Sequence, residues 1–491
     1  MSDFSELLSR YIKGKEIRVY PMVNYCGLDR STMYKIMHGK RNPPSPEIRD
    51  RMADFMHLTP EENQMFRHAY DISVVGREVY FRRKAVEKFI LNFPAVSELK
   101  RLEFPEMAAD SQSSRQNAVL DGIGCVPFSD RSSFHFYVQK ILEDAVSEKD
   151  ERVGLFVQPD CDFLFDYLTG LQISGCPFRI EHLFCLNKTD HLPGEESFSL
   201  LDGLSRLLPL FINGINYEAY YFYDDIYSHY HNLNAFSSMI LTESYAILCT
   251  SDYQRGILHH DKATVAMLWS LFDSYREKCR PLFLVPHSLM EECQMVTSVI
   301  TRNSSFFVLE PEPCLVPFLE KTYVERFLHP QMPDRNLVME TLTNYLDTSR
   351  QCILNNDFHF YYCWEDLDRF AETGILSELP EALGGDCLLS VQERISLLET
   401  MIRNFSRLHF RFLKPPYDRA AERIRLCAGE NSLYLQFSDV LNRRVYLFPQ
   451  EPGLILALYD YLQSLGDEQL FSEEESKDYL KQVVRRLYTA L

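Results

Sequence analysis

The first 72 residues place their apolar side chains at helical intervals. Apolar residues recur three and four positions apart at Phe4, Leu7, Leu8, Tyr11 and Ile12, which puts them on one face of a helix. The same reasoning predicts further helices over residues 19–26 and 30–38. Because short polar segments separate these helices, the pattern predicts a small all-α domain over residues 1–72.

A very short turn joins the second and third predicted helices. Gly27 supplies the positive φ angle that ends the first of them, and Asp29 is a favourable N-cap for the next. Leu28 lies between them and is expected to fill the core. The inner face of the later helix is predicted to consist of Met33, Ile36 and Met37.

The outer face of that helix carries the candidate chemistry. A helix-turn-helix projects the first residues of its second helix into a DNA major groove. Arginine and lysine pair there with guanine, while serine and threonine permit close approach. Base contacts are therefore predicted from Arg30, Ser31, Thr32, Tyr34 and Lys35. Lys40 and Arg41 follow the helix at once and suit contacts to phosphates.

This stretch resembles the XRE family, the helix-turn-helix domains of the Cro and phage-repressor type. The family pattern of a glycine turn, R-S-T and G-K-R-x-P is matched by Gly27, Leu28, Asp29, Arg30, Ser31, Thr32, Met33, Ile36, Gly39, Lys40, Arg41 and Pro43. The family often begins the preceding helix with Thr-Gln, whose Gln reaches a phosphate. Arg18 and Val19 occupy those places here, which departs from the family pattern, and Arg18 is expected to contact the DNA backbone. A helix over residues 46–56, followed after residues 57–63 by one that ends at Asp71, matches the closing helices of the family.

Beyond about residue 133 short apolar runs alternate with helical segments. The runs predict strands over 152–159, 178–186, 218–225, 238–251, 306–311 and 408–415. Helices are predicted over 199–212, 264–277 and 391–404. This alternation is typical of a mixed sheet covered by helices, so a large α/β body is expected. Residues 73–132 are predicted to connect it to the helical domain by a helix and a polar linker at 104–121.

The body repeats one order of elements. Helix, strand, hairpin and helix follow one another over residues 200–277 and again over 393–465. Both hairpins carry Ser-Asp before their last strand, at Ser251-Asp252 and Ser438-Asp439. The order predicts two similar α/β lobes, over residues 133–300 and 301–491.

Two lobes in this order resemble the phospholipase-D-like fold, whose members carry H-x-K-x4-D in each lobe. The H-x-K of the body is His260-Asp261-Lys262, and Met267 stands where the acid is required. The comparable part of the second lobe, Phe448-Pro449-Gln450, has no histidine. The resemblance therefore implies a scaffold without the chemistry. We expect no enzyme activity and no catalytic residues.

The distribution of charge also distinguishes the N-terminal domain from the body. Net charge is −19 overall, but residues 1–100 carry 17 Lys and Arg against 13 Asp and Glu, net +4, which leaves −23 on the remainder. Because a polyanion repels an acidic body, contact with nucleic acid belongs to the N-terminal domain.

Other candidate sites are few. The 13 cysteines are dispersed without C-x-x-C spacing, as in proteins with reduced thiols. No signal peptide or membrane-spanning run is found, so a cytoplasmic protein without a membrane partner is expected. Asp224, Asp225, His229 and His231 lie among tyrosines, where a solvated loop is favoured over a metal site. No metal and no cofactor are predicted.

Two functions fit these features. In the first, the chain is a transcriptional regulator of double-stranded DNA, and its body dimerises and senses a small-molecule or protein effector. One helix-turn-helix covers only a half-site, which favours a homodimer held by residues beyond about 100. In the second, the chain is an enzyme or interaction protein with a phosphodiesterase-like scaffold, and its helix-turn-helix only docks or recruits. The first function is favoured because the glycine turn, the Asp29 N-cap and the basic residues that follow the helix occur together.

Overall fold

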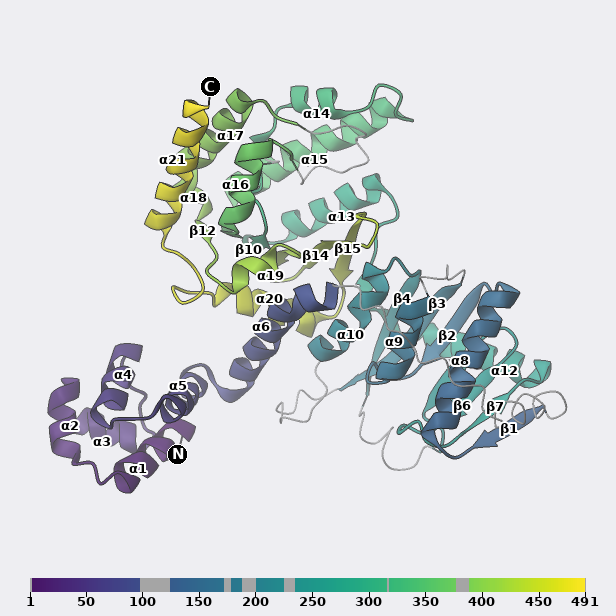
Figure 1. The fold of residues 1–491 in the computed structure, drawn as a ribbon, viewed down its shortest axis with the longest axis horizontal. Helices are drawn as coiled ribbons and strands as arrows, with labels where there is room; N and C mark the ends of the chain where they lie inside the picture. The colour runs from purple at the N-terminus through teal and green to yellow at the C-terminus, as the bar shows by residue number, and fades with distance from the viewer. Residues whose placement is uncertain are drawn as a thin grey trace. The chain divides into compact units, whose positions relative to one another are not determined.

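The computed structural model describes residues 2–97, 124–171, 178–187, 200–224, 235–315, 318–376 and 388–490. These residues form a multi-domain α/β protein with two compact units (Figure 1). The first unit contains the residues up to Ala85, and the second contains the described residues from Val86 onward. The linker predicted at 104–121 lies outside the described residues.

The first unit is helical. Its helices are α1 (Asp3–Gly14), α2 (Val19–Cys26), α3 (Arg30–Met37), α4 (Pro46–Phe55) and α5 (Pro60–Val75), and α6 (Arg77–Ser97) begins in it. The three helices predicted from periodicity and the two implied by the resemblance are thus present, with ends that differ by up to four residues. Phe4, Met22, Ile36 and Phe66 are fully buried in its core. Burial of these apolar faces supplies most of the stability that helices of this length lack alone.

The second unit holds two mixed sheets. The strands of the first sheet are β1 (Cys125–Phe128), β2 (Arg152–Phe156), β3 (Arg179–Asn187), β4 (Tyr217–Asp224), β5 (Ser238–Leu241), β6 (Ala246–Cys249), β7 (Gly256–His259) and β8 (Arg280–Pro281). Those of the second are β9 (Phe283–Leu284), β10 (Ser305–Glu310), β11 (Asp357–Tyr362), β12 (Phe410–Phe412), β13 (Arg425–Gly429), β14 (Leu433–Ser438) and β15 (Arg444–Pro449). We call the first sheet with its helices the first lobe and the second sheet with its helices the second lobe.

Helices cover both sheets. Those of the first lobe are α8 (Arg131–Glu148), α9 (Asp162–Leu171), α10 (Leu200–Ile212) and α12 (Lys262–Arg276). Those of the second are α13 (Leu289–Arg302), α14 (Lys321–Phe327), α15 (Arg335–Asn355), α16 (Trp364–Thr373), α17 (Val391–Arg403), α18 (Phe405–Leu408), α19 (Tyr417–Ala421), α20 (Pro452–Gln463) and α21 (Glu473–Thr489).

The two sheets share one topology. The first runs β4-β3-β2-β5-β6-β7-β1, with β8 outside β4, and the second runs β12-β11-β10-β13-β14-β15-β9. In each, three parallel strands are followed by an antiparallel meander and an antiparallel edge strand. The helix after the meander, α12 or α20, packs on the central strands. The repeated order predicted from sequence is therefore present as a repeated three-dimensional arrangement.

The repeated Ser-Asp pair has a structural reason. Asp252 accepts hydrogen bonds from the Gln254 amide (3.1 Å) and from the Thr250 hydroxyl. Asp439 accepts from the amides of Leu441 (2.9 Å) and Arg443 (2.7 Å). Each aspartate thus closes the turn before the last strand of its meander by bonding to backbone two residues ahead.

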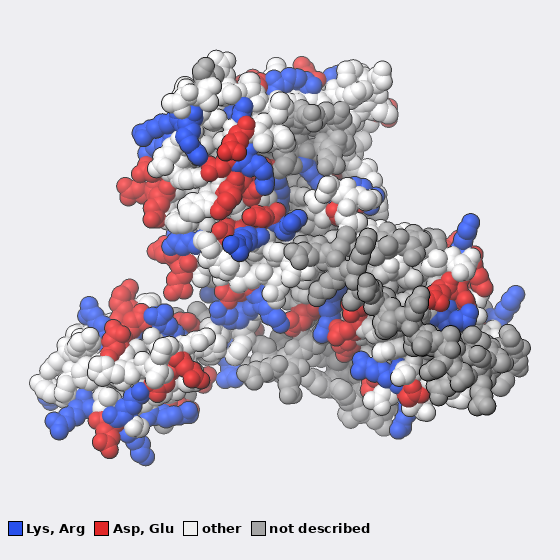
Figure 2. All heavy atoms as spheres, in the orientation of Figure 1, with Lys and Arg blue, Asp and Glu red and all other residues white. Residues whose placement is uncertain are grey.

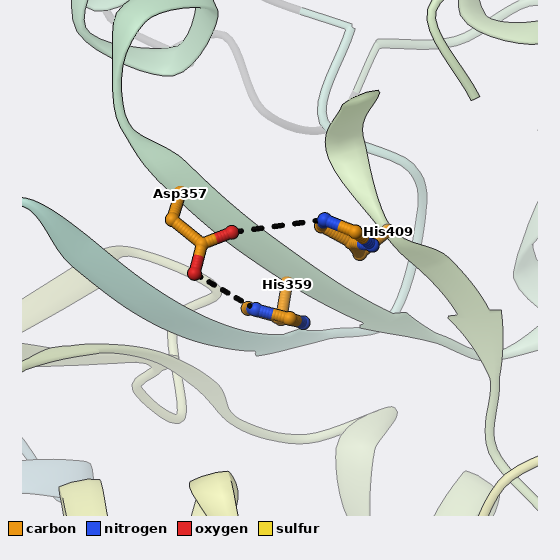
Figure 3. A group of neighbouring side chains, drawn as sticks. All are labelled: Asp357, His359 and His409. Atoms are coloured by element: carbon orange, nitrogen blue, oxygen red, sulfur yellow. Dashed lines mark hydrogen bonds and ion pairs between the residues drawn. The ribbon is translucent and has the colours of Figure 1, made fainter. Parts of the chain in front are cut away.

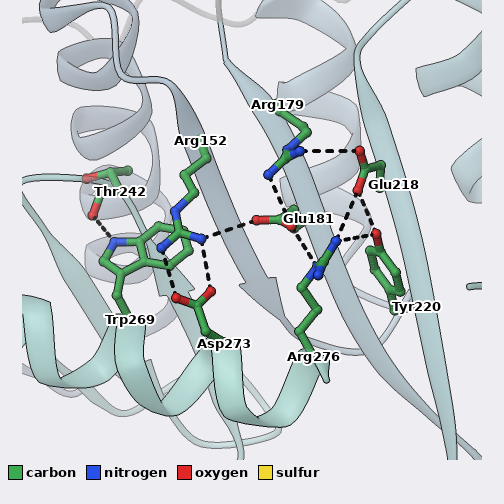
Figure 4. A network of polar contacts seen from close by, with 9 residues as sticks. All are labelled: Arg152, Arg179, Glu181, Glu218, Tyr220, Thr242, Trp269, Asp273 and Arg276. Atoms are coloured by element: carbon green, nitrogen blue, oxygen red, sulfur yellow. Dashed lines mark hydrogen bonds and ion pairs between the residues drawn. The ribbon is translucent and has the colours of Figure 1, made fainter. Parts of the chain in front are cut away.

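A charged network fixes α12 to the first sheet (Figure 4). The Glu181 side chain on β3 is 1% exposed, and its carboxylate lies 2.8 Å from Arg276 Nε, 3.4 Å from Arg179 and 3.6 Å from Arg152. Arg152 also pairs with Asp273 and lies 3.9 Å from the Trp269 ring centre. A buried carboxylate needs such partners to remain charged. We regard this network as structural because its charges are mutually paired.

The strand β11 was absent from the sequence-based expectations. The helix α15 runs to Asn355, and β11 begins at Asp357 with no glycine or proline between them. The apolar pattern therefore passes from a helix to a buried aromatic strand without a local signal. β1, also unpredicted, lies in the stretch expected to connect the domains.

Candidate nucleic-acid interface

The turn between α2 and α3 is built by two short-range devices. Gly27 adopts a left-handed conformation (φ 69°). Its amide donates a hydrogen bond to the Asn24 carbonyl, and the Leu28 amide donates one to the Val23 carbonyl. Asp29 caps α3 by accepting the Thr32 amide (2.8 Å) and the Thr32 hydroxyl (2.6 Å). The Thr32 hydroxyl and amide bonds hold the pKa of Asp29 below its ordinary value.

The α3 helix divides into a buried and an exposed face. Met33 and Ile36 are buried in the core. Four of the predicted base-contact residues, Arg30, Ser31, Tyr34 and Lys35, are exposed. The fifth, Thr32, is half-buried, and its hydroxyl is engaged by Asp29. The geometry therefore presents four of the five predicted side chains to solvent and gives Thr32 a capping function.

Aromatic residues that sequence reasoning did not select extend this face. The Arg30 guanidinium lies 4.5 Å from the centre of the Tyr20 ring, which is 56% exposed on α2. Side-chain hydrogen bonds from Asn24 and Arg30 lower the pKa of Tyr20. The Tyr34 ring contacts the His38 ring at a tilt of 30°, with ring centres 4.0 Å apart, and the His38 Nδ1 atom is 2.8 Å from the Tyr34 carbonyl. Only their three-dimensional neighbours set Tyr20 and His38 apart from other surface residues.

The predicted backbone contacts lie beside the same face. Arg18, Lys40 and Arg41 are exposed, and none of them forms an ion pair with a residue that the structure describes. Elsewhere in the unit, by contrast, Lys15 pairs with Glu62 and Arg77 with Asp3. Figure 2 shows Lys and Arg side chains along the lower edge of this unit. Cations without internal partners are free to take phosphates.

The histidine motif of the first lobe lies at the end of β7. His260 follows β7, and its amide donates to the Gly124 carbonyl (3.1 Å). Met267, at the position that would need an acid, is 56% exposed on α12. The second lobe joins at the other side of the sheet, where the Leu282 amide donates to Ala219 and the Gln450 amide to Leu282. Five strand spacings, about 24 Å, separate β7 from β4. Among the described residues, the backbone hydrogen bonds that join the second lobe to the first sheet therefore lie beside β4 and not beside His260.

The tyrosine-rich segment that begins in β4 contains the remaining candidate residues. Asp224 ends β4, whereas Asp225, His229 and His231 lie outside the described residues. Among the described helices, none is both long and apolar enough to cross a bilayer.

Comparison with known proteins gives distant likenesses alone. No protein-family model and no curated protein matches the chain. One similar solved structure is TrmBL2, an archaeal chromatin protein described as showing a novel mode of DNA binding; identity is 11%, coverage is 57% of this chain and 99% of that one, and the TM-score is 0.21. Another is phosphatidylserine synthase of Haemophilus influenzae, with 9% identity, 77% and 97% coverage and a TM-score of 0.23. At these values neither likeness bears on the function of this chain.

Proposed function

We propose that this chain is a sequence-specific DNA-binding transcriptional regulator of the XRE type. The observation that carries the proposal is the exposed face of α3, where Arg30, Ser31, Tyr34 and Lys35 face solvent beside the exposed cations Arg18, Lys40 and Arg41. In this proposal the α3 side chains read base edges and the three flanking cations bind phosphates.

Salt dependence of binding tests the phosphate contacts. A bound fragment is first selected from a genomic library, and its affinity is measured by gel shift across a salt series with competitor DNA. The double variant Lys40→Ala/Arg41→Ala is expected to lower the magnitude of the slope of log K against log salt by about 2. For each phosphate contact that is lost, the DNA keeps roughly 0.9 counterion that binding would otherwise release.

Arg67→Ala is the matched control, because Arg67 is 51% exposed on α5, on a different helix from α3. Its slope is expected to equal that of the wild type. Failure to select any fragment that resists competitor, together with an unchanged slope in the double variant, would favour the alternative in which this domain docks a protein.

Assembly follows from the half-site geometry. We propose that the protein acts as a homodimer held by the body, because the first unit is small and has no long heptad repeat, whereas the second is large enough for a symmetric interface. Multi-angle light scattering is expected to give a dimer for the full chain and a monomer for residues 1–97. A monomeric full chain, or a dimeric fragment, contradicts this placement.

The body is proposed to sense an effector rather than to catalyse. The support is the exposed Met267 in place of an acid and the place of His260 beside β7, five strands from β4 in the sheet. Hydrolysis of bis(p-nitrophenyl) phosphate by the purified chain is expected to equal a buffer blank. Turnover that is lost in His260→Ala would overturn the proposal and support a phosphodiesterase.

A further inference from the structure

Three polar side chains meet at one edge of the second sheet, outside the proposed DNA interface (Figure 3). Asp357 and His359 are two residues apart on β11, so they share one face of the strand. His409 directly precedes β12, the parallel neighbour of β11. The His359 ring stacks between Phe307 and His409, with ring centres 4.8 Å and 4.6 Å apart. The sheet therefore orients both imidazoles.

The Asp357 carboxylate lies between the two histidines. Its Oδ2 atom is 3.2 Å from His359 Nε2, and its Oδ1 atom is 3.7 Å from His409 Nε2. The three candidate ligand atoms all lie within 4.8 Å of one another. Ligands at about 2.0–2.1 Å from a tetrahedral zinc ion are roughly 3.3 Å apart. The 3.2 Å separation between Asp357 Oδ2 and His359 Nε2 already matches this spacing, whereas His409 Nε2 would have to move closer to complete the site.

A fourth residue orients one ligand. Glu473, the first residue of α21, places its Oε1 atom 3.3 Å from His409 Nδ1. A carboxylate can only accept there, so Nδ1 carries a proton, and Nε2 is the ring nitrogen left for a metal. Histidines that bind metals usually donate their other ring N–H to a carboxylate in this way. The arrangement thus contains both the ligands and an outer carboxylate.

The geometry points to a binding site for a divalent transition metal of the zinc type, with Asp357, His359 and His409 as ligands and Glu473 as a positioning residue. Two imidazoles and one carboxylate suit zinc or its neighbours in the first transition row, whereas magnesium and calcium prefer all-oxygen sites. Asp357 is 53% exposed, so the fourth position is open to water. The metal joins β11 and β12, and through Glu473 it is linked to α21.

Cobalt absorption is the test, performed on the full chain after removal of metals by chelator. One equivalent of Co²⁺ is expected to produce the visible d–d bands of a four-coordinate ion, and Zn²⁺ is expected to displace it while Mg²⁺ does not. His359→Gln and His409→Gln are expected to abolish these bands. Glu473→Gln is expected to retain them and to weaken Zn²⁺ binding about 10- to 100-fold, measured by competition with a chromophoric chelator.

His329→Gln is the matched control, since His329 is an exposed histidine of the same lobe outside the cluster. Asp357→Asn provides a second ligand variant at an exposed position, so a folding defect in one histidine variant leaves the proposal testable. Identical bands in the wild type and all ligand variants, strong thiolate charge-transfer bands, or no Co²⁺ binding at all would overturn it. None of these readouts depends on DNA binding, so the outcome is independent of the proposed function.

Discussion

Replacing Arg30 by alanine is expected to weaken binding to the selected operator about 5- to 150-fold, which corresponds to about 1–3 kcal/mol for a bidentate guanine contact. The Arg30 guanidinium is already held 4.5 Å from the Tyr20 ring centre. Less side-chain freedom is therefore lost on binding than for an unrestrained arginine. The measurement is a gel shift with operator and with random DNA at one salt concentration.

Two variants separate base reading from charge. Arg30→Lys retains the charge without the planar fork, so it is expected to lose specificity while it keeps most of the affinity for random DNA. Arg67→Ala removes an equal charge from α5 and is expected to bind the operator like the wild type. Equal losses of Arg30→Ala on operator and random DNA would leave Arg30 with only a phosphate contact.

Acidification from pH 7 to 4 is expected to destabilise the first lobe through His182 by up to about 3 kcal/mol. Burial lowers the pKa of His182 from 6.5 to about 4, and each pKa unit corresponds to about 1.36 kcal/mol. Between these two values the unfolded chain binds a proton that the folded chain does not. Stability from the neutral histidine is therefore present above about pH 6.5 and is lost as pH falls toward 4.

The surroundings of His182 explain this preference for the neutral form. The side chain is fully buried on β3, with Nε2 2.9 Å from the Val157 carbonyl and Nδ1 2.5 Å from the Tyr217 hydroxyl. The carbonyl can only accept, so Nε2 carries the proton and Nδ1 accepts from Tyr217. Burial also raises the pKa of Tyr217, which keeps it a donor. A second proton on Nδ1 would break the hydrogen bond that Tyr217 donates and would place a charged ring in the core.

The test compares the wild type with His182→Gln at each pH. Trp269 lies in the first lobe and Trp364 in the second, and the chain has 2 tryptophans, so Trp364→Phe in both proteins makes fluorescence report the first lobe. The stability advantage of the wild type is expected to shrink as pH falls from 7 to 4. Parallel pH profiles of the two proteins would contradict the assignment.

Asp366 makes this comparison necessary. Burial raises its pKa to about 6, so the stability from its protonated form is present below about pH 4 and is lost as pH rises through 6. This dependence opposes that of His182 in the wild-type profile. Because both proteins contain Asp366, its effect cancels in their difference.

Local spacing was sufficient for the helices of the first unit and for most strands of the second. Residues on one face of a helix recur every three to four positions, and the glycine turn and the Asp29 cap each involve residues at most five positions apart. The segment from Gly27 to Met37 could therefore be predicted closely. The repeated order of the two lobes could also be read from sequence, since each hairpin carries its own turn signal. These features depend on contacts between residues that are near one another in the chain.

The tertiary structure alone decided which distant side chains meet. The stacking of Arg30 on Tyr20 requires the angle between two helices, and the partners of His182 come from β4 and from the residue after β2. His409 lies 50 positions beyond His359, and the parallel pairing of β11 with β12 brings them together. Such contacts depend on sheet order and register, which no short spacing in the sequence encodes, because the hydrogen bonds that define them close loops of tens of residues.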